Sequence, residues 1–319
     1  MSCVNAETKK CPFCGSVNNA RFDYSTMDCL GGSYCLMRCE ECETRYLHPS
    51  PSAELLAAFY GADYYGHASA KFVGVVERLE NWIRTDRAIF VHSMASGKGV
   101  VVDVGCGNGQ FISLLSQMGY AAIGIEPEGG SYERASIIDG IRVIRGDATM
   151  LAEIQGSVDI ITMWHVFEHL PDPQIITALV GEKLKKGGLF FISLPNIESL
   201  QAKIFRGNWL ALDPPRHIFL PTKKALIGCM KKHGFVLVCQ RNREFDQAIA
   251  GTVFSILNLV SPKDMFFNWI KKKNNPTGII TMLVSCSAVI VVLPFALLIN
   301  IFELIIHSPA SLELVFRKE

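Results

Sequence analysis

The chain has 319 residues, of which 49% are hydrophobic and 19% are charged. Its 31 basic and 30 acidic side chains leave a net charge of +1, which gives no electrostatic reason to expect a nucleic-acid partner. The composition also excludes a disordered chain, and the length suits one large domain with a small one. The charged fraction is below the usual quarter, so the placement of the surplus apolar residues is informative.

Cysteines are concentrated near the N-terminus, where seven of the eleven fall within the first 42 residues. Four of them form two Cys-x-x-Cys pairs, Cys11 with Cys14 and Cys39 with Cys42, which are separated by 24 residues. Two such pairs can bring four thiolates to one tetrahedral Zn²⁺ ion, whose binding would help a small module to fold. We therefore expect a structural zinc site. Reduced, buried cysteines are the alternative, and a cysteine between the pairs could replace a ligand.

An apolar run from Val100 opens into glycines at positions 105, 107 and 109 and continues as an apolar helix from Phe111. A strand, a glycine turn and a helix in this order let a ligand approach the backbone closely. Helical stretches separate the strands that follow, which predicts a parallel, doubly wound sheet with its ligand at the carboxyl ends of the strands. Further strands are expected at 121–125, 141–144, 158–163, 189–194, 235–240 and 311–317.

The glycine turn indicates which nucleotide is bound. Glu126 ends the second strand, 21 residues after Gly105, where a carboxylate can accept both ribose hydroxyls of an adenosine ligand. Gln110 stands where the dinucleotide fingerprint requires its third glycine, which disfavours NAD. The chain has no Gly-Lys-Ser/Thr motif, so a phosphate-binding P-loop is excluded.

The glycine turn, Glu126, Asp147-Ala148 and the strand end Trp164-His165 together resemble the class I S-adenosylmethionine-dependent methyltransferases. The resemblance covers about residues 60–240, with an outlying match at the C-terminus. It implies an S-adenosylmethionine pocket whose turn holds the methionine end of the cofactor. The cofactor-binding residues that it implies are Asp103, Gly105, Cys106, Gly107, Asn108, Gly109, Glu126, Pro127, Asp147, Ala148, Trp164 and His165.

The cysteine module, Arg216-His217 and the His-x-x-Glu-His segment narrow this resemblance. They are similar to a bacterial subgroup associated with surface polysaccharide or lipid modification. The ubiquinone-type O-methyltransferases are a neighbouring group. The resemblance therefore implies methyl transfer to a hydroxyl of a small molecule, with a sugar or lipid-linked glycan as the expected acceptor.

Three polar side chains follow the fourth strand. His165, Glu168 and His169 have i, i+3, i+4 spacing, which predicts one face of a helix beginning after that strand. A hydroxyl acceptor must lose its proton, so we expect His169 as the base and Glu168 to orient it or to contact substrate. His217 is a third candidate, in a proline-rich loop suited to a polar acceptor. A purely structural role for these side chains is the alternative.

The His-x-x-Glu-His segment also admits a metal. Some related O-methyltransferases use such a helix to hold a divalent ion that activates the hydroxyl, which makes Mg²⁺ a further cofactor candidate at residues 165–169. Those relatives carry glutamate where His165 stands in this chain.

The surplus apolar residues lie mainly between Asn274 and Phe302, 29 residues without a charged side chain. The run is long enough for one transmembrane helix, and the lysines at 271–273 would mark its cytosolic flank. A single crossing would, however, place the last strand, 311–317, on the wrong side of the membrane. Pro294 would break or kink the run.

We therefore expect a re-entrant or interfacial helical hairpin, with Ala248–Val260 as a further amphipathic segment. A hydrophobic cap buried against the domain or a dimer partner is the alternative. The N-terminus has no apolar signal-peptide core, so a cytoplasmic protein at the inner face of the cell membrane is expected.

The sequence thus predicts an α/β fold with a Rossmann-like methyltransferase sheet whose last strand is antiparallel. The expected domains are a zinc-ribbon-like module (1–50), a methyltransferase core with covering helices (51–243), an apolar membrane-associated insertion (244–310) and the last strand of the core (311–319). A ubiquinone-like phenol O-methyltransferase and a non-catalytic S-adenosylmethionine-binding scaffold are the alternative functions.

Overall fold

The computed structural model describes residues 10–59, 73–242, 245–261 and 279–319. The chain divides into two compact units. The first, called the sheet unit, comprises residues 62–193, 227–240 and 313–319. The second, called the ribbon unit, comprises residues 1–61, 194–226 and 241–312. This division follows spatial contacts and mixes segments from distant parts of the chain. The predicted domains are continuous stretches of sequence, and their boundaries stay a prediction.

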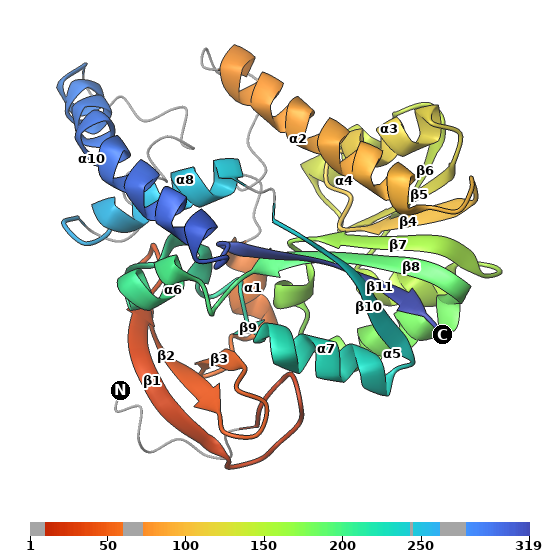
Figure 1. The fold of residues 1–319 in the computed structure, drawn as a ribbon, viewed down its shortest axis with the longest axis horizontal. Coiled ribbons are helices and arrows are strands. Elements are labelled where there is room, and N and C mark those ends of the chain that lie inside the picture. The colour runs from red at the N-terminus through yellow and green to blue at the C-terminus, as the bar shows by residue number, and fades with distance from the viewer. Residues whose placement is uncertain (1–9, 60–72, 243–244, 262–278) are drawn as a thin grey trace. The chain divides into compact units, whose positions relative to one another are not determined.

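A seven-stranded sheet with the order β10-β11-β8-β7-β4-β5-β6 organises the sheet unit. The neighbours from β6 to β8 are parallel, and the last strand, β11, runs antiparallel, as the sequence predicted (Figure 1). The strands are β4 (Val100–Val104), β5 (Ala121–Glu126), β6 (Ile141–Arg145), β7 (Val158–Trp164), β8 (Leu184–Pro195), β10 (Phe235–Arg241) and β11 (Ser311–Lys318).

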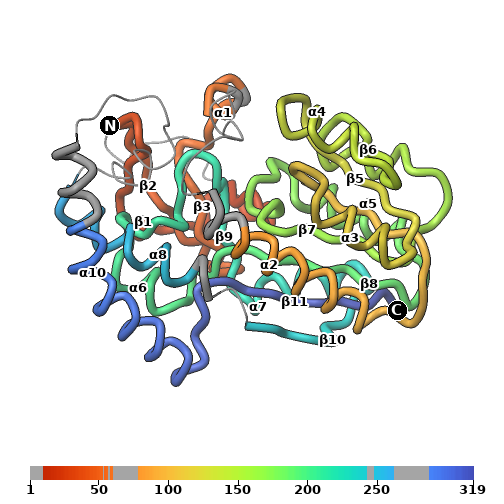
Figure 2. Tube along the Cα trace, turned by 90° about the horizontal axis from the view of Figure 1, so that it is seen from above, coloured from red at the N-terminus to blue at the C-terminus, as the bar shows by residue number. Residues whose placement is uncertain are grey.

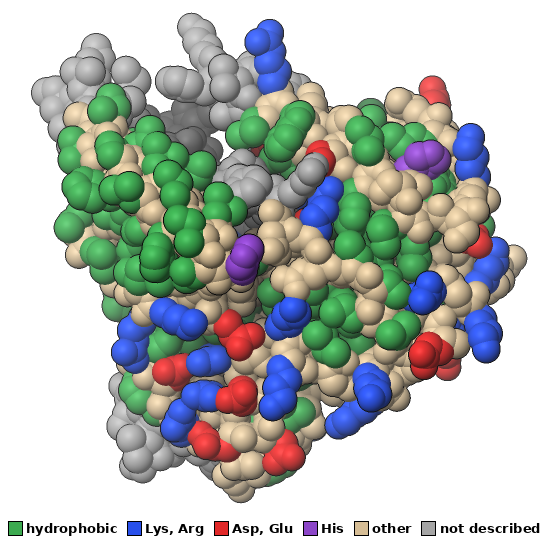
Figure 3. All heavy atoms as spheres, in the orientation of Figure 1, with side chains coloured by type: hydrophobic (Ala, Val, Ile, Leu, Met, Phe, Trp, Pro, Cys, Tyr) green, Lys and Arg blue, Asp and Glu red, His purple; other side chains and the backbone are tan. Residues whose placement is uncertain are grey.

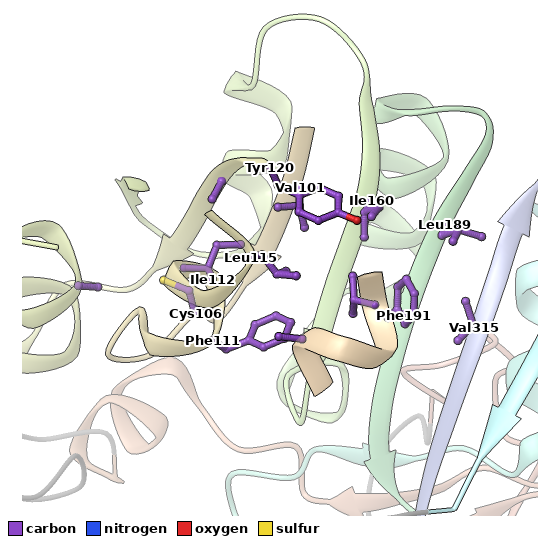
Figure 4. Close-up of a cluster of buried hydrophobic side chains, with 14 residues drawn as sticks. Val101, Cys106, Phe111, Ile112, Leu115, Tyr120, Ile160, Leu189, Phe191 and Val315 are labelled. Carbon is purple, nitrogen blue, oxygen red and sulfur yellow. The ribbon is translucent and has the colours of Figure 1, made fainter. Parts of the chain in front are cut away.

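Helices cover this sheet, with α2 and α3 on one face and α5 on the other (Figure 1). On the first face, Phe111 from α3 packs with Val101, Ile160 and Phe191 from three strands of the sheet, and all four side chains are buried (Figure 4). Apolar residues thus occupy both the helix stripe and the strand face, as a buried parallel sheet requires. The helices are α2 (Val73–Met94), α3 (Gln110–Gln117), α4 (Gly130–Ser136), α5 (Pro173–Lys183) and α7 (Lys223–Lys232).

The ribbon unit contains a four-stranded antiparallel sheet in the order β1-β2-β3-β9. The first three strands form the N-terminal module, whereas β9 comes from the segment after β8. Tyr34, Leu36 and Leu47 from this sheet share a buried cluster with Trp209. The module therefore completes its core with residues far along the chain. The strands are β1 (Ala20–Met27), β2 (Ser33–Cys39), β3 (Arg45–His48) and β9 (Phe219–Leu220).

Four helices complete the described part of the ribbon unit: α1 (Ala53–Phe59), α6 (Leu200–Phe205), α8 (Phe245–Leu257) and α10 (Ile279–Ile305). Helices α8 and α10 lie side by side (Figures 1 and 2). Val253 and Leu257 of α8 pack against Ala296 of α10, and all three side chains are buried.

The apolar insertion differs from the predicted hairpin in two respects. From Ile279 onwards the run forms one continuous helix, α10, and Pro294 lies inside it without ending it. A proline removes only one backbone hydrogen bond, and Ala296, two residues further on, packs against α8. Ala248–Val260 is not a surface amphipathic segment, since most of α8 is buried and only Leu259 and Val260 beyond its end are exposed large apolar residues. The predicted lysine flank at 271–273 lies outside the described residues.

Candidate functional site

The glycine turn after β4 leaves a bare stretch of backbone in the sheet unit. Gly105 has φ +72°, and a Cβ atom there would lie 2.5 Å from Val166 Cγ2. Gly107 has φ +55°, but a Cβ atom there would meet no atom within 4 Å. Both positions favour glycine for its backbone conformation, and the space above Gly107 is open. The turn therefore leaves open space beside its backbone at the carboxyl end of β4.

Two buried carboxyl groups flank this turn. Glu126, at the end of β5, accepts a hydrogen bond from the Gly107 amide at 2.9 Å, and burial raises its pKa. Asp103, on β4, is the register partner of Thr162 on β7 and accepts a hydrogen bond from Thr162 Oγ1 at 2.6 Å. Burial raises the pKa of Asp103 to about 7. The structure thus places both predicted carboxyl groups beside the bare turn, where a cationic ligand would favour their ionised forms.

Arg87, on α2, is a further charged group near this site that sequence reasoning missed. Its guanidinium lies 4.7 Å from the centroid of the Trp164 ring, and its positive charge partly offsets the rise in the Asp103 pKa. Arg87 precedes Ala88 and lies four residues before Val91, both of which are fully buried. The sequence offered one signal for Arg87, because it stands next to the apolar residues of a helix that was expected to cover the sheet.

The remaining predicted cofactor residues differ in their surroundings. Cys106 is buried and packs beside Gly124 of β5, so its backbone and not its thiol faces the turn. Asn108 accepts a hydrogen bond from Arg134 Nε at 3.0 Å. Asp147 caps a 3₁₀ turn by accepting a hydrogen bond from the Thr149 amide at 2.8 Å. Ala148 is buried, Pro127 is exposed, and Trp164 and His165 are half-buried at the end of β7.

The predicted helix at 165–169 is wrong, because only a 3₁₀ turn forms at Phe167–His169. Prolines at 171 and 173 restrict the residues before them, so the next α-helix, α5, begins at Pro173. His165 has a left-handed backbone conformation, with φ +55°. Such a conformation is unfavourable for a residue with a side chain and clusters at functional sites.

A buried carboxylate nevertheless lies between two imidazoles in this segment. The Glu168 side chain is fully buried, and its Oε1 lies 3.4 Å from His165 Nδ1. A carboxylate oxygen of Glu168 and a ring nitrogen of His169 lie within 4.8 Å of each other. His165 is further held by β8, whose Ser193 carbonyl accepts its amide hydrogen bond at 2.9 Å. This grouping can orient an imidazole for proton transfer.

His217, the third predicted catalytic residue, belongs to the ribbon unit. Its Nδ1 donates a hydrogen bond to the Ala211 carbonyl oxygen at 2.8 Å, and the side chain is largely buried. Nearby, Arg216 binds both carboxylate oxygens of Asp213, at 2.5 and 2.9 Å. The loop 213–217 is therefore ordered by its own polar contacts.

The four predicted zinc ligands come together in the ribbon unit. Their sulfur atoms all lie within 4.8 Å of one another, with Cys11 Sγ 3.8 Å from Cys42 Sγ and Cys14 Sγ 3.6 Å from Cys39 Sγ. A tetrahedral Zn²⁺ ion with bonds of about 2.3 Å to sulfur requires edges of about 3.8 Å. The cysteine cluster therefore fits a zinc-ribbon-like module.

Comparisons with known proteins show the family to which the chain belongs. Residues 75–240 match the family described as "Methyltransferase domain". A ubiquinone biosynthesis O-methyltransferase from Xanthomonas euvesicatoria is 34% identical over 102 residues, which cover 30% of this chain and 43% of that protein. The protein of the same name from Methylococcus capsulatus is 34% identical over 120 residues, covering 36% of this chain and 50% of that protein.

The chain thus spans about half the length of the curated relatives it matches. Its structure is also similar to an S-adenosylmethionine-dependent methyltransferase from Archaeoglobus fulgidus, with a TM-score of 0.49 and 19% identity, covering 78% of this chain and all of that one. The family match includes more than half of this chain, which therefore belongs to the methyltransferase domain family. The sheet order and the antiparallel β11 identify the class I S-adenosylmethionine-dependent type.

The buried carboxyl group of Asp103 predicts a pH-dependent gain in stability for Asp103→Asn. Because the folded pKa of about 7 exceeds the ordinary value of 3.8, the free energy of unfolding falls as the pH rises from about 4 to 7. The neutral amide removes this loss, which is on the order of 4 kcal/mol above pH 7. Thermal denaturation from pH 4.5 to 8.5 should show a stabilisation that grows towards pH 7 and then levels off.

The control is Asp139→Asn, which makes the same change at an exposed position of the sheet unit. If Asp103→Asn stabilised the protein equally at pH 4.5 and pH 8, the pKa of Asp103 would not be raised by burial.

Proposed function

We propose that this chain transfers a methyl group from S-adenosylmethionine to a hydroxyl group of a small molecule. The observation that carries the proposal is the bare turn at Gly107 between the buried carboxyl groups of Asp103 and Glu126. S-adenosylmethionine, when bound, supplies an electrophilic methyl group on a positively charged sulfur. In this proposal the two carboxyl groups give the pocket the complementary charge, and Glu126 accepts hydrogen bonds from the ribose hydroxyls.

The residues after β7 supply the proposed base. Methyl transfer is an in-line displacement, so holding the acceptor oxygen in line with the methyl group provides much of the acceleration. His169 removes the hydroxyl proton at a ring nitrogen, and the fully buried Glu168 stabilises the imidazolium that forms. His217, in its proline-rich loop, contacts the acceptor in this proposal.

A divalent ion at residues 165–169 is the alternative way to activate the hydroxyl. The side chains there offer two imidazoles and one fully buried carboxylate. Mg²⁺ prefers several oxygen ligands, including waters, so this set of donors suits it poorly. The geometry therefore favours a histidine base. Zinc-loaded protein should transfer methyl groups equally well with and without added Mg²⁺ or Mn²⁺, and a rate that depends on either added ion would favour the metal instead.

Two classes of acceptor are compatible with these residues. A sugar or lipid-linked glycan hydroxyl suits the polar loop that carries Asp213, Arg216 and His217. A ubiquinone-like phenol is the second candidate, favoured by the names of the relatives from Xanthomonas and Methylococcus. Both kinds of acceptor can carry long lipid chains. An apolar surface on the protein that rests on a membrane therefore suits either of them.

We propose that the exposed face of α10 rests on the cytoplasmic surface of the cell membrane. Among the described residues, Ser287–Ile305 is long and apolar enough to cross a membrane by length and composition alone, and only 17% of its most apolar window is buried. Its outward side chains include Ile290, Phe295, Leu298 and Phe302, which gather into an apolar surface (Figure 3). An interfacial helix with one apolar face is typical of proteins that lie on membranes.

Substitution of Glu126 tests the cofactor pocket. Glu126→Ala should weaken binding of S-adenosylhomocysteine about 10- to 100-fold, because the ribose loses a charged acceptor. Glu128→Ala, two residues away and paired with Arg145 at the surface, is the matched control and should bind like the wild type. Isothermal titration calorimetry measures both. Absence of binding by the wild-type, metal-loaded protein would refute the proposed function.

Substitution of His169 tests the proposed base. His169→Ala should lower the rate of methyl transfer about 10²- to 10⁴-fold, while the affinity for S-adenosylhomocysteine stays within about twofold. Transfer of labelled methyl groups to panels of sugar and phenol acceptors measures the rate. A variant as active as the wild type would show that His169 is structural. A wild type that binds the cofactor but methylates neither panel would favour the scaffold alternative.

Two charges placed on α10 test the membrane surface. Phe295 is 61% exposed and Phe302 is 51% exposed, so Phe295→Glu with Phe302→Glu should leave the fold intact. Binding to vesicles of phosphatidylethanolamine and phosphatidylglycerol should weaken about tenfold or more, as measured by cosedimentation. Ile137→Glu, at an exposed apolar residue of the sheet unit, is the control. Wild-type protein that stays in the supernatant would exclude the proposed membrane contact.

A further inference from the structure

We infer that the four-cysteine site positions the loop 207–220, which carries Asp213, Arg216 and His217, and that Phe13 and Phe219 are the positioning residues that connect them. The inference rests on the proposed function only for the role of this loop in acceptor binding. All of the residues involved belong to the ribbon unit.

The two Cys-x-x-Cys segments have the same backbone structure. The Gly15 amide donates to the Cys11 carbonyl at 2.9 Å, and the Glu43 amide donates to the Cys39 carbonyl at 2.9 Å. Gly15 and Glu43 both have positive φ values, +77° and +60°. Each turn thus aims its two sulfur atoms at the same point, and a Zn²⁺ ion there would hold the two turns together.

The first turn contacts the loop through an aromatic pair. Phe13 lies between the ligands Cys11 and Cys14, and its ring centroid is 5.7 Å from that of Phe219. The side chains of Phe13 and Phe219 are 2% and 1% exposed, so the contact is part of the core. Phe219 follows His217 by two residues. A displacement of the first turn would therefore remove the packing that holds the end of the loop.

The second turn reaches the same end of the loop through the backbone. Strand β3 begins three residues after Cys42 and pairs with β9, with Tyr46 opposite Phe219 and Arg45 opposite Leu220. The Leu47 amide also donates to the Ile218 carbonyl at 3.0 Å. The chain immediately after His217 thus forms the edge of a sheet whose preceding strand is anchored at the metal site.

The start of the loop is held by the other strands of the module. Thr26 Oγ1 donates to the Gly207 carbonyl at 2.9 Å, and a Cβ atom at Gly207 would lie 2.4 Å from the Ser25 carbonyl oxygen. Trp209 is fully buried in the cluster that includes Leu36 and Leu47. Both ends of the loop therefore depend on the module, and a module this small depends on its metal.

Hydrogen exchange on the full-length protein tests this inference, with zinc bound and after removal of zinc by a chelator. Amide exchange at residues 207–220 should rise at least tenfold on removal, whereas exchange at residues 100–126 and affinity for S-adenosylhomocysteine should stay within about twofold. Loss of protection confined to residues 10–48, or spread over residues 100–126 as well, would overturn the inference. Protein that takes up no zinc would also overturn it.

The variant Phe219→Ala removes the aromatic contact between the first cysteine turn and the loop but leaves the four cysteines unchanged. This variant should keep its bound zinc, measured by metal analysis, yet show faster exchange at residues 207–218. The control is Phe22→Ala, which removes a half-exposed ring from β1 of the same module. A zinc-loaded Phe219→Ala variant with wild-type protection at these residues would overturn the inference. Because cofactor binding is measured separately, failure here is distinguishable from failure of the proposed function.

Discussion

The last strand of the chain, β11, hydrogen-bonds between β8 and β10 in the interior of the sheet. Residues 242–310 must therefore leave the sheet after β10 and return beside it, whatever they form in between. A single membrane crossing between β10 and β11 would separate β11 from its partners, so the chain has to leave the sheet and return on the same side. The same strand order brings the ends of β4, β5 and β7 together, where the glycine turn and its carboxyl groups lie.

Helix α10 packs on α8 through Ala296 and carries two polar residues, Asn300 and Glu303, on the same buried side. Asn300 donates to Thr252 Oγ1 of α8 at 2.9 Å, and Glu303 accepts two hydrogen bonds from Gln201, at 3.0 and 2.9 Å. Buried polar groups are costly unless they are hydrogen-bonded. These hydrogen bonds therefore hold α10 in one position against α6 and α8 of the ribbon unit. Most of the large apolar side chains in the second half of α10 nevertheless face outwards, whereas an ordinary surface helix turns its apolar side chains towards the core.

Local patterns predicted most of the fold and much of the site. Each Cys-x-x-Cys turn and the glycine turn are local structures, and Glu126 reaches the glycine turn because β4 and β5 are adjacent parallel strands. The predicted helix at 165–169 is wrong because the two prolines that follow limit the segment to a 3₁₀ turn, although its polar spacing fits one face of a helix. Arg87 and the pairing of β9 with β3 were missed because both depend on contacts between distant parts of the chain. Zinc, the acceptor and the roles of the histidines stay predictions.

The central claim is that this fold catalyses methyl transfer and does not merely bind its cofactor. The most direct measurement adds purified, zinc-loaded protein and methyl-labelled S-adenosylmethionine to a total lipid and polar extract of bacterial cells. We expect label to appear in one low-molecular-weight or lipid-linked product as an alkali-stable methyl ether, with formation of S-adenosylhomocysteine in equal amount. Tight cofactor binding without transfer of label to any component would contradict the account and identify a non-catalytic scaffold.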